Sequence, residues 1–279
     1  MSEVRLFVEP GHYYSPIVDT EALKKTGFSE LRGRDELAGV SLDFNSMEQL
    51  FDAAMHAQAD LDFPEEKTSG YRYYSKNEMF SIGDARILAG MIRLHKPKRI
   101  IEVGSGFSSA VILDTLNRES DAQTSVTFIE PHTERLMGLL SDQDKRRVEI
   151  IESGIQEVPL STFDSLEAGD ILFLDTTHIS KTGSDVNHEV FHILPRLKSG
   201  VIIHFHDVFA DFEYPDSWIF DHNRSWNELY ILRAFLMYNS AFYVALANHA
   251  LSKKHPNTVM RFYPEMINEP GGGLWIAKK

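Results

Sequence analysis

The sequence predicts an α/β fold, in which a mostly parallel β-sheet carries helices on both faces and follows an N-terminal extension. Two observations carry this prediction. Strand-like and helix-like segments alternate from about Lys98 onward, as in parallel sheets joined by helical crossovers. The first strand, residues 99–103, is apolar at Ile100, Ile101 and Val103, which is typical of a central strand that is covered on both faces.

The segment before this strand is expected to form a helical cover. Residues 46–59 have the apolar spacing of an amphipathic helix that a serine caps, and residues 79–94 predict a second helix that leads to the first strand. Residues 11–16 and 71–74 are rich in aromatic and turn residues without a period, which predicts loops or lids. Surface aromatics packed on the core explain these two segments equally well.

The later elements follow the same alternation. Short apolar runs predict strands at residues 125–129, 148–151, 171–174, 201–205, 242–247 and 274–277. Residues 189–197 and 228–238 have helical spacing, and Gly200 is a plausible end for the first of these helices. The strands after Trp226 are the candidates for an antiparallel edge.

Composition limits the function. A chain of 279 residues with 43% hydrophobic content can bury the core of one large domain. The formal net charge of -13, without a cluster of Lys and Arg, argues against nucleic acid as a partner. The absence of cysteine excludes disulfides, thiolate metal sites and cysteine nucleophiles. Because no segment resembles a signal peptide or a membrane span, we expect a cytoplasmic protein without a membrane partner.

A glycine-rich turn follows the first strand and predicts a ligand site. The strand ends at Glu102-Val103, and Gly104-Ser-Gly106 comes next. Glycine lacks a Cβ, so the backbone can turn sharply and approach a ligand closely. We expect Ser108 or Ser109 to cap the following helix, whose free N–H groups would face an anionic or polar ligand end.

Residues that are missing from this turn exclude two classes of ligand. A dinucleotide fingerprint needs a third glycine where this chain has Ser109, and a phosphate-binding P-loop needs Gly-Lys-Ser or Gly-Lys-Thr. A nucleoside without a pyrophosphate remains. The next predicted strand, 125–129, ends at Glu130-Pro131, where a carboxylate can accept both hydroxyl groups of a ribose. An ordinary turn with a solvated acid is the alternative.

Acids and histidines gather at the ends of the next two strands. Asp175 ends the fourth strand, His178 follows it, and His204, His206 and Asp207 end the fifth. The carboxyl ends of neighbouring parallel strands meet at one sheet edge, so these side chains should lie together. His204 and His206 share one strand face, which leaves open that only one of them is functional.

Further motifs run along nearly the whole chain, at residues 11–17, 77–85, 96–109, 174–178, 181–186, 204–208, 224–228 and the closing Gly-Gly-Gly-Leu-Trp-Ile. Together they resemble the class I S-adenosylmethionine-dependent methyltransferases, in particular a bacterial subgroup of small-molecule methyltransferase-like proteins. The resemblance implies a Rossmann-like, seven-stranded sheet with a reversed hairpin at one edge. Residues 96–279 would bind S-adenosylmethionine, and residues 1–95 would form the extension and cover of one compact unit.

The resemblance also implies cofactor-binding residues. The methionine and ribose parts would contact the first-strand turn, Glu130 with Pro131 would hold the ribose, and Ile155 with Gln156 would hold the adenine. The chain departs from the family at Ser153-Gly154, where many relatives have an aspartate. The rings of Tyr13, Tyr14, Tyr73 and Tyr74 could close over the sulfonium, because aromatic faces attract cations. The full implied set is Tyr14, Glu102, Gly104, Ser105, Gly106, Ser109, Glu130, Pro131, Ile155, Gln156 and Asp175.

The reaction most consistent with these residues is methylation of a hydroxyl group on a small molecule. His178 or His206 can act as the general base, with Asp175 or Asp207 orienting the ring. Alternatively, Asp175, His206 and Asp207 hold a divalent ion, either Mg²⁺ or, because of the histidine, Mn²⁺, Fe²⁺ or Zn²⁺.

Other functions stay open at this point. They are N-methylation, cyclisation or lysis of the cofactor, and a non-catalytic binding module. The residues that the resemblance assigns to the substrate are Lys181, Arg224, Trp226 and Asn227. A homo-oligomer is possible, and the sequence does not identify the methyl acceptor.

Overall fold

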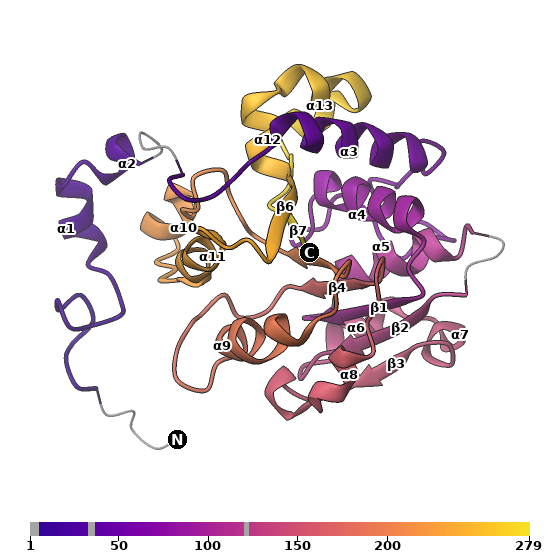
Figure 1. The fold of residues 1–279 in the computed structure, drawn as a ribbon, viewed down its shortest axis with the longest axis horizontal. Coiled ribbons are helices and arrows are strands. Elements are labelled where there is room, and N and C mark those ends of the chain that lie inside the picture. Colours follow the sequence, from indigo (N-terminus) through magenta and orange to yellow (C-terminus); the bar gives the residue numbers. More distant parts are fainter. Residues whose placement is uncertain (1–5, 33–36, 120–122) are drawn as a thin grey trace.

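The computed structural model describes residues 6–32, 37–119 and 123–279. In this part of the chain, one seven-stranded sheet has the order β3-β2-β1-β4-β5-β7-β6 (Figure 1). The strands are β1 (Arg99–Val103), β2 (Ser125–Ile129), β3 (Glu149–Ile151), β4 (Ile171–Leu174), β5 (Ile202–Phe205), β6 (Phe242–Ala247) and β7 (Leu274–Lys278). The predicted strands are therefore confirmed, with ends that differ by at most one residue.

Helices cover both faces of the sheet, with α3 and α4 on one side and α8 and α9 on the other (Figure 1). The helices are α1 (Thr20–Lys25), α2 (Phe28–Leu31), α3 (Phe44–Ala57), α4 (Ile82–His95), α5 (Phe107–Leu116), α6 (Glu134–Leu139), α7 (Asp142–Lys145), α8 (Leu160–Asp164), α9 (Asp185–His188), α10 (Asp216–Phe220), α11 (Glu228–Leu236), α12 (Asn248–Lys254) and α13 (Pro256–Phe262). Short 3₁₀ turns occupy Ile155–Glu157, Leu194–Arg196 and Pro264–Ile267. The predicted α/β class is confirmed.

The strand order places the ligand crevice. Strands β1 to β5 pair in parallel, whereas β7 pairs antiparallel with both β5 and β6. The predicted antiparallel edge is therefore confirmed. The strand order runs in opposite directions from β1 and β4, so the carboxyl ends of these two neighbours form the switch point at which open α/β sheets bind ligands.

Residues 189–196 are helical, as predicted, but they do not form a regular α-helix. The structure has the short α9, then a π-helical turn over Glu189–Ile193, and then the 3₁₀ turn Leu194–Arg196. Pro195 lies in that last turn. Because proline has no backbone N–H and its ring crowds the carbonyl four residues earlier, a regular α-helix cannot continue here.

The helix caps also differ from the predictions. Helix α3 begins at Phe44, because Asp43 and not Ser46 is the cap, and its side chain accepts the N–H of Ser46 at 3.2 Å. Helix α4 begins after Ser81, whose Oγ accepts the N–H of Asp84 at 3.1 Å. A side-chain acceptor fixes the first turn in both cases.

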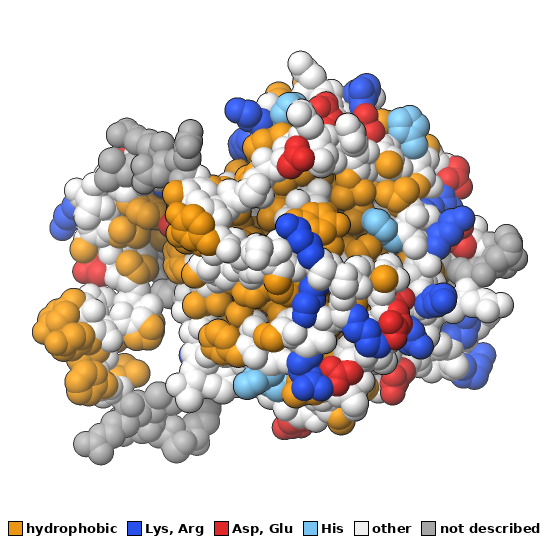
Figure 2. All heavy atoms as spheres, viewed as in Figure 1, with side chains coloured by type: hydrophobic (Ala, Val, Ile, Leu, Met, Phe, Trp, Pro, Cys, Tyr) orange, Lys and Arg blue, Asp and Glu red, His pale blue; other side chains and the backbone are white. Residues whose placement is uncertain are grey.

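The N-terminal extension has two parts. Helices α3 and α4 pack on each other and on the sheet, whereas the segment with α1 and α2 lies at the side of the body, beside α10 (Figure 1), where Leu23 and Phe28 pack against the core. The rings of Phe28 and Phe220 join it to α10, with centroids 6.5 Å apart. Its apolar side chains form the orange group at the left of Figure 2. Phe7 and Tyr13 there are 87% and 81% exposed.

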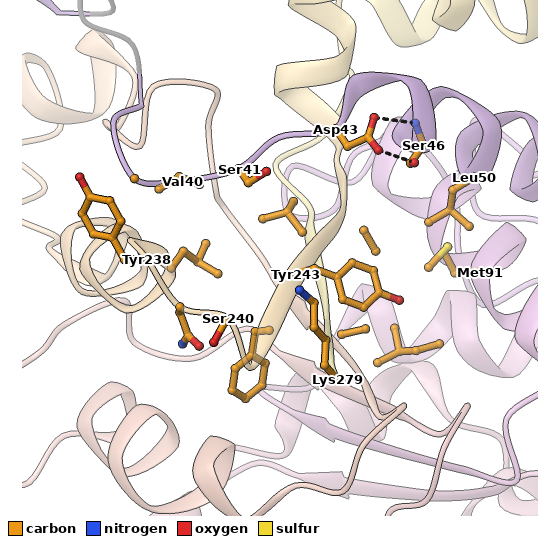
Figure 3. Close-up of a pocket in the computed structure, with 18 of the residues that line it drawn as sticks. Val40, Ser41, Asp43, Ser46, Leu50, Met91, Tyr238, Ser240, Tyr243 and Lys279 are labelled. Atoms are coloured by element: carbon orange, nitrogen blue, oxygen red, sulfur yellow. Dashed lines mark hydrogen bonds between the residues drawn. The ribbon is translucent and has the colours of Figure 1, made fainter.

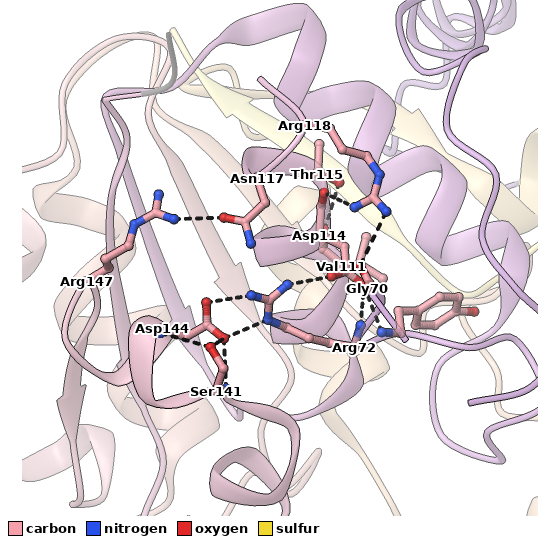
Figure 4. A network of polar contacts seen from close by, with 11 residues as sticks. Gly70, Arg72, Val111, Asp114, Thr115, Asn117, Arg118, Ser141, Asp144 and Arg147 are labelled. Atoms are coloured by element: carbon pink, nitrogen blue, oxygen red, sulfur yellow. Dashed lines mark hydrogen bonds and ion pairs between the residues drawn. The ribbon is translucent and has the colours of Figure 1, made fainter. Parts of the chain in front are cut away.

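A buried ion network fastens the loop that contains residues 71–74 (Figure 4). The guanidinium of Arg72 lies 2.7 Å from Asp114 in α5 and 2.6 Å from Asp144 in α7. Asp114 also accepts the backbone N–H of Tyr73 at 2.9 Å. Both carboxylates are buried, so paired charges fasten the loop to α5 and α7.

Among the described helices, none combines the length and the apolar character needed to span a bilayer.

Candidate active site

The turn after β1 is fixed by the strands on either side of it. The N–H of Gly104 donates to Ile129 O of β2 at 3.0 Å, and the N–H of Asp175 donates to Val103 O at 2.9 Å. Gly104 has φ +80°, and a Cβ there would lie 1.7 Å from Asp175 O. Only glycine fits this position, because both the backbone angle and the space exclude a side chain.

Glu130 is anchored beside the turn. Its carboxylate accepts the N–H of Ser105 at 2.9 Å and the N–H of His132 at 2.8 Å, with one oxygen for each. Each oxygen keeps a second lone pair for a ligand hydroxyl. The adjoining cavity of about 100 Å³ is lined by Gly104, Glu130 and Asp175 among others, and the Oγ of Ser105 is buried there without a hydrogen-bond partner in the described chain.

Glu102 and Ser109 lie beneath the turn and do not line this cavity. The hydroxyl of Ser109 accepts the N–H of Gly106 at 3.0 Å and donates to the carboxylate of Glu102. Burial raises the pKa of Glu102 to about 8. The predicted serine cap of α5 is therefore wrong. Gly106 is the cap, and Ser109 closes the first turn from inside the helix, because a side chain can reach back from the third helical position.

The tips of β4 and β5 bring the predicted acids and one histidine together. The Nε2 of His178 lies 3.4 Å from Asp175 and 3.4 Å from Asp207. His178 has φ +59° and Asp207 has φ +58°. Such left-handed backbone is costly for these residues and is concentrated at functional sites. Asp175 also lines the turn cavity, so the ligand turn and the cluster are adjacent.

The other ring nitrogen of His178 is held by a residue that the sequence reading did not select. Its Nδ1–H donates to Glu228 Oε2 at 2.7 Å, and both side chains are buried. Burial alone would lower the pKa of His178, but the carboxylates of Asp175 and Glu228 raise it to about 10. The ring of Trp226 packs against His178, with centroids 4.4 Å apart.

His206 lies on the other side of Asp175 and Asp207. Its Nδ1 is 3.6 Å from Asp175 and 3.4 Å from Asp207, and its Nε2 is 3.4 Å from Asp84 of α4. Burial alone would lower the pKa of His206, but these three carboxylates raise it well above its ordinary value. The pKa of Asp84 is lowered in spite of its burial, because it faces His206. His206 is therefore held as a cation between acids.

His204 does not share this environment. Its ring stacks on Phe173 and lies tilted against Trp275, with centroids 4.1 and 4.5 Å away. Burial and the neighbouring charge of His206 lower the pKa of His204 to about 3. Of the two histidines on this strand, His206 faces the acids and His204 packs in the core.

Three ligand atoms in the cluster could hold a metal ion. They belong to Asp175, His178 and Asp207, and all lie within 4.8 Å of one another. The sequence predicts His206 in place of His178, with the same two acids. His206 also lies near both carboxylates, but His178 from the loop after β4 completes the compact set.

The structure separates several of the other predicted residues from the turn cavity. Tyr14 is 64% exposed and its described ring contacts are with Phe7, His12 and Tyr13 in the separate N-terminal segment. It therefore does not cover the turn here, because the extension leads away from the body. Tyr73 is buried in the cover, and Tyr74 packs against Phe107 at the start of α5.

The predicted adenine residues follow β3. Ile155 is buried, and the side chain of Gln156 donates to Gly183 O at 3.0 Å. Pro131 is exposed beside Glu130. None of these three residues lines the turn cavity.

The predicted substrate residues have different surroundings. Lys181 is exposed in the loop after β4. The amide of Asn227 accepts the N–H of Ser180 at 2.6 Å and donates to its carbonyl. The guanidinium of Arg224 lies over the rings of Trp218 and Trp226, at 4.2 and 4.5 Å. These contacts hold the loop that carries His178.

The sequence reading missed Glu228 and Asp84 as parts of the cluster. Both belong to motifs that were recognised, Glu228 as the last residue of 224–228 and Asp84 within 77–85. An acid inside an apolar helical segment was the available signal, since such a residue is rarely buried unless it is paired. Neither position shows from the sequence which strand tip it faces.

A different cavity, of about 550 Å³, lies at the open edge of the sheet (Figure 3). Asp43, Leu50, Tyr243 and Lys279 are among the residues that line it. The labelled residues come from the segment before α3, from α3 and α4, from the loop after α11, from β6 and from the chain end. Because it holds none of the clustered acids and histidines, we do not assign the chemistry to it.

Comparison with protein families gives one match within the described core. Residues 101–208 match the family described as "Methyltransferase domain". This range contains the turn, Glu130, and the tips of β4 and β5. An uncharacterised protein of Archaeoglobus fulgidus is 32% identical over 171 residues, which is 59% of this chain and 76% of the relative.

Solved structures resemble this chain at low identity. A methyltransferase of Podospora anserina bound to SAH has 17% identity and a TM-score of 0.47, with 94% of this chain and 96% of that chain covered. The O-methyltransferase of tomaymycin synthesis from Streptomyces achromogenes, in complex with SAM, has 15% identity and a TM-score of 0.44, with 93% and 98% covered.

Proposed function

Because this chain belongs to the class I S-adenosylmethionine-dependent methyltransferases, we propose that it methylates a hydroxyl group of a small molecule. One observation carries this proposal. Asp175 both lines the cavity at the glycine-rich turn and lies 3.4 Å from His178. The proposed site for the methyl donor therefore lies next to side chains that can accept the proton of the methyl acceptor.

The turn fits the nucleoside end of S-adenosylmethionine. Glu130 offers free lone pairs to ribose hydroxyls, and its carboxylate lines the cavity at the turn. When bound, the cofactor supplies a methyl group on a sulfonium, which is both electrophile and leaving group. The chain must then position the acceptor in line and remove its proton.

His178 and Asp207 are the residues proposed for that proton. Glu228 holds the Nδ1 of His178, so Nε2 is directed at Asp175 and Asp207. Because the pKa of His178 is raised, the ring is cationic at neutral pH and the adjoining carboxylates are the available acceptors. Asp207, whose pKa burial raises, is the stronger base of the two, since the pKa of Asp175 is lowered by His206 and His178 in spite of burial.

A divalent ion is the second way to activate the acceptor. Asp175, His178 and Asp207 supply two carboxylate oxygens and one imidazole nitrogen in a compact set. This mixture suits Mn²⁺, Fe²⁺ or Zn²⁺ better than Mg²⁺. His178 must lose its proton to become a ligand, so ion binding would release protons.

Two measurements test the proposal. Cofactor-stripped protein should bind S-adenosylmethionine and S-adenosylhomocysteine in calorimetry, and should transfer a labelled methyl group to members of a panel of phenols and alcohols. Failure to bind either nucleoside would overturn the donor assignment, and labelling of amines alone would overturn the choice of oxygen.

Chelation decides between the two ways of activation. With an ion, excess chelator should abolish transfer and added Mn²⁺ should restore it, and elemental analysis should find metal in the untreated protein. Unchanged transfer in excess chelator would leave Asp207 as the base.

A further inference from the structure

The acceptor side of the proposed site has a cavity of its own. This cavity, which we call the acceptor cavity, has a volume of about 670 Å³. It is lined by residues of the 75–81 and 268–272 loops and by His206 and Asp207. The volume is in the range that suits a small-molecule ligand. None of the predicted substrate residues lines it.

Two residues join this cavity to the glycine-rich turn. Met79 and Phe80 line both cavities, and the ring of Phe80 stacks on His206 with centroids 5.1 Å apart. The two cavities therefore lie on either side of residues 79 and 80. A ligand in the larger cavity would meet the proposed donor site at the tips of β4 and β5.

The walls of the acceptor cavity are acidic. Glu78, Asp84, Asp207 and Glu269 line it. Lys76 also lines it, but its Nζ lies 3.0 and 3.1 Å from the carboxylates of two glutamates outside the cavity, Glu65 and Glu66. Lys76 is thus already paired.

The two histidines of the cavity do not reverse this balance. His206 is cationic but faces Asp84, Asp175 and Asp207. His249 accepts the N–H of Ala210 at its Nδ1, 2.9 Å away, and burial lowers its pKa. It is therefore neutral.

Aromatic rings complete the walls. Trp218 and Phe209 line the cavity and pack edge to face, with centroids 5.4 Å apart. The Trp218 ring already carries one cation, because the guanidinium of Arg224 lies 4.2 Å from its centroid. Carboxylates next to aromatic faces are the combination that binds ammonium groups.

We propose, on the basis of the proposed function, that the methyl acceptor is a small hydroxyl compound with an ammonium group, bound between the 75–81 and 268–272 loops. An acceptor with a carboxylate or phosphate would meet Glu78 and Glu269, which the described residues leave without an ion pair, and no unpaired lysine or arginine among the described lining residues. The net charge of -13 would favour the approach of a cation in the same way.

The test compares three phenols that share a two-carbon tail at the para position and differ in the group at its end. They are tyramine, which ends in an ammonium, para-ethylphenol, which has no charged group, and para-hydroxyphenylpropionate, which ends in a carboxylate. Calorimetry with and without S-adenosylhomocysteine should give the tightest binding for tyramine, roughly 10-fold tighter than for the neutral phenol, and the weakest for the anion.

Reversing the charge of two lining glutamates tests whether the preference for tyramine arises in this cavity. Glu78→Lys with Glu269→Lys changes two exposed acids of the lining and should remove or invert the preference for tyramine. Glu167→Lys is the matched control, because Glu167 is exposed near the amino end of β4 and, among the described residues, forms an ion pair with Lys198 alone. That variant should bind the three phenols in the same order of affinity as the wild type. Circular dichroism checks the fold of each variant.

The outcomes separate this proposal from the methyltransferase assignment. Binding of the anion as tightly as tyramine, no binding of tyramine at millimolar concentration, or an unchanged preference in the double variant each overturns it, whatever the donor data show. Donor binding is measured separately, so its failure would overturn the proposed function and leave the charge preference standing.

Discussion

The Nδ1 of His178 donates to Glu228 Oε2 at 2.7 Å, and both side chains are buried. His178 follows β4, whereas Glu228 begins α11 fifty positions later. The contact fixes the ring so that Nε2 is directed at Asp175 and Asp207. The N–H of Glu228 also donates to His178 O at 3.1 Å, so the start of α11 fixes both the ring and the backbone of the proposed catalytic group.

Removal of the charge of Glu228 should destabilise the protein. Glu228→Gln keeps the size of the side chain but leaves His178 without its closest counter-charge, at a cost of about 3 kcal/mol. Glu213→Gln is the control, because Glu213 is half-buried and accepts a neutral hydrogen bond from Tyr230 at 2.8 Å, worth about 1 kcal/mol. Urea unfolding in the presence of chelator measures both. Equal losses would contradict the special role of Glu228.

The charge of His178 should make stability depend on pH. Its folded pKa of about 10 lies above the unfolded value of about 6.5. The stabilisation is therefore complete below about pH 6.5 and is lost as the pH rises through the folded pKa, at up to about 1.4 kcal/mol per pH unit. The unfolding free energies of wild type and His178→Gln should converge over this window in chelator. A constant difference would show that the pKa of His178 is not raised.

Glu130 should control the affinity for the methyl donor. Glu130→Gln loses the charge that accepts ribose hydroxyls, and calorimetry should find S-adenosylhomocysteine bound about 10- to 100-fold more weakly. Glu134→Gln is the matched change, since Glu134 is exposed in the first turn of α6, and it should bind like wild type. The same dissociation constant for both variants would argue against a ribose at Glu130.

Gly104 should tolerate no side chain. Gly169→Ala is the control, because Gly169 has φ +86° with no atom within 4 Å of an added Cβ, so only the left-handed backbone is penalised, by about 1 to 2 kcal/mol. Gly104→Ala adds a collision with Asp175 O at 1.7 Å and should cost at least about 3 kcal/mol or prevent folding. Urea unfolding of the two variants compares them. Similar losses would mean that the turn can move away from β4.

Arg72 should stabilise the fold far more than a surface arginine does. Arg72→Met leaves two buried carboxylates, Asp114 and Asp144, unpaired, at about 3 to 5 kcal/mol. Arg196→Met removes an exposed pair with Asp164, which is worth at most about 1 kcal/mol. The melting temperature of Arg72→Met should therefore fall further below that of the wild type than the melting temperature of Arg196→Met does. A small effect at Arg72 would mean that the loop is held by its packing alone.

Much of the sheet could be predicted because local patterns decide it. Residues 99–103 and 171–174 are short apolar runs between turn residues, and the observed strands have these bounds. Helix ends were harder. Asp43 and Ser46 are both good capping residues, and the choice depends on the direction of the incoming chain.

The sequence by itself determined the fold class, the glycine-rich turn and the group of acids and histidines at two strand tips, because each follows from periodicity, glycine spacing or strand order. Only the tertiary structure decided which histidine completes the compact ligand set. It brought Glu228 to His178 and Asp84 to His206 across 50 and 122 positions. Such pairings depend on how helices pack against the sheet, and local sequence carries no record of that packing.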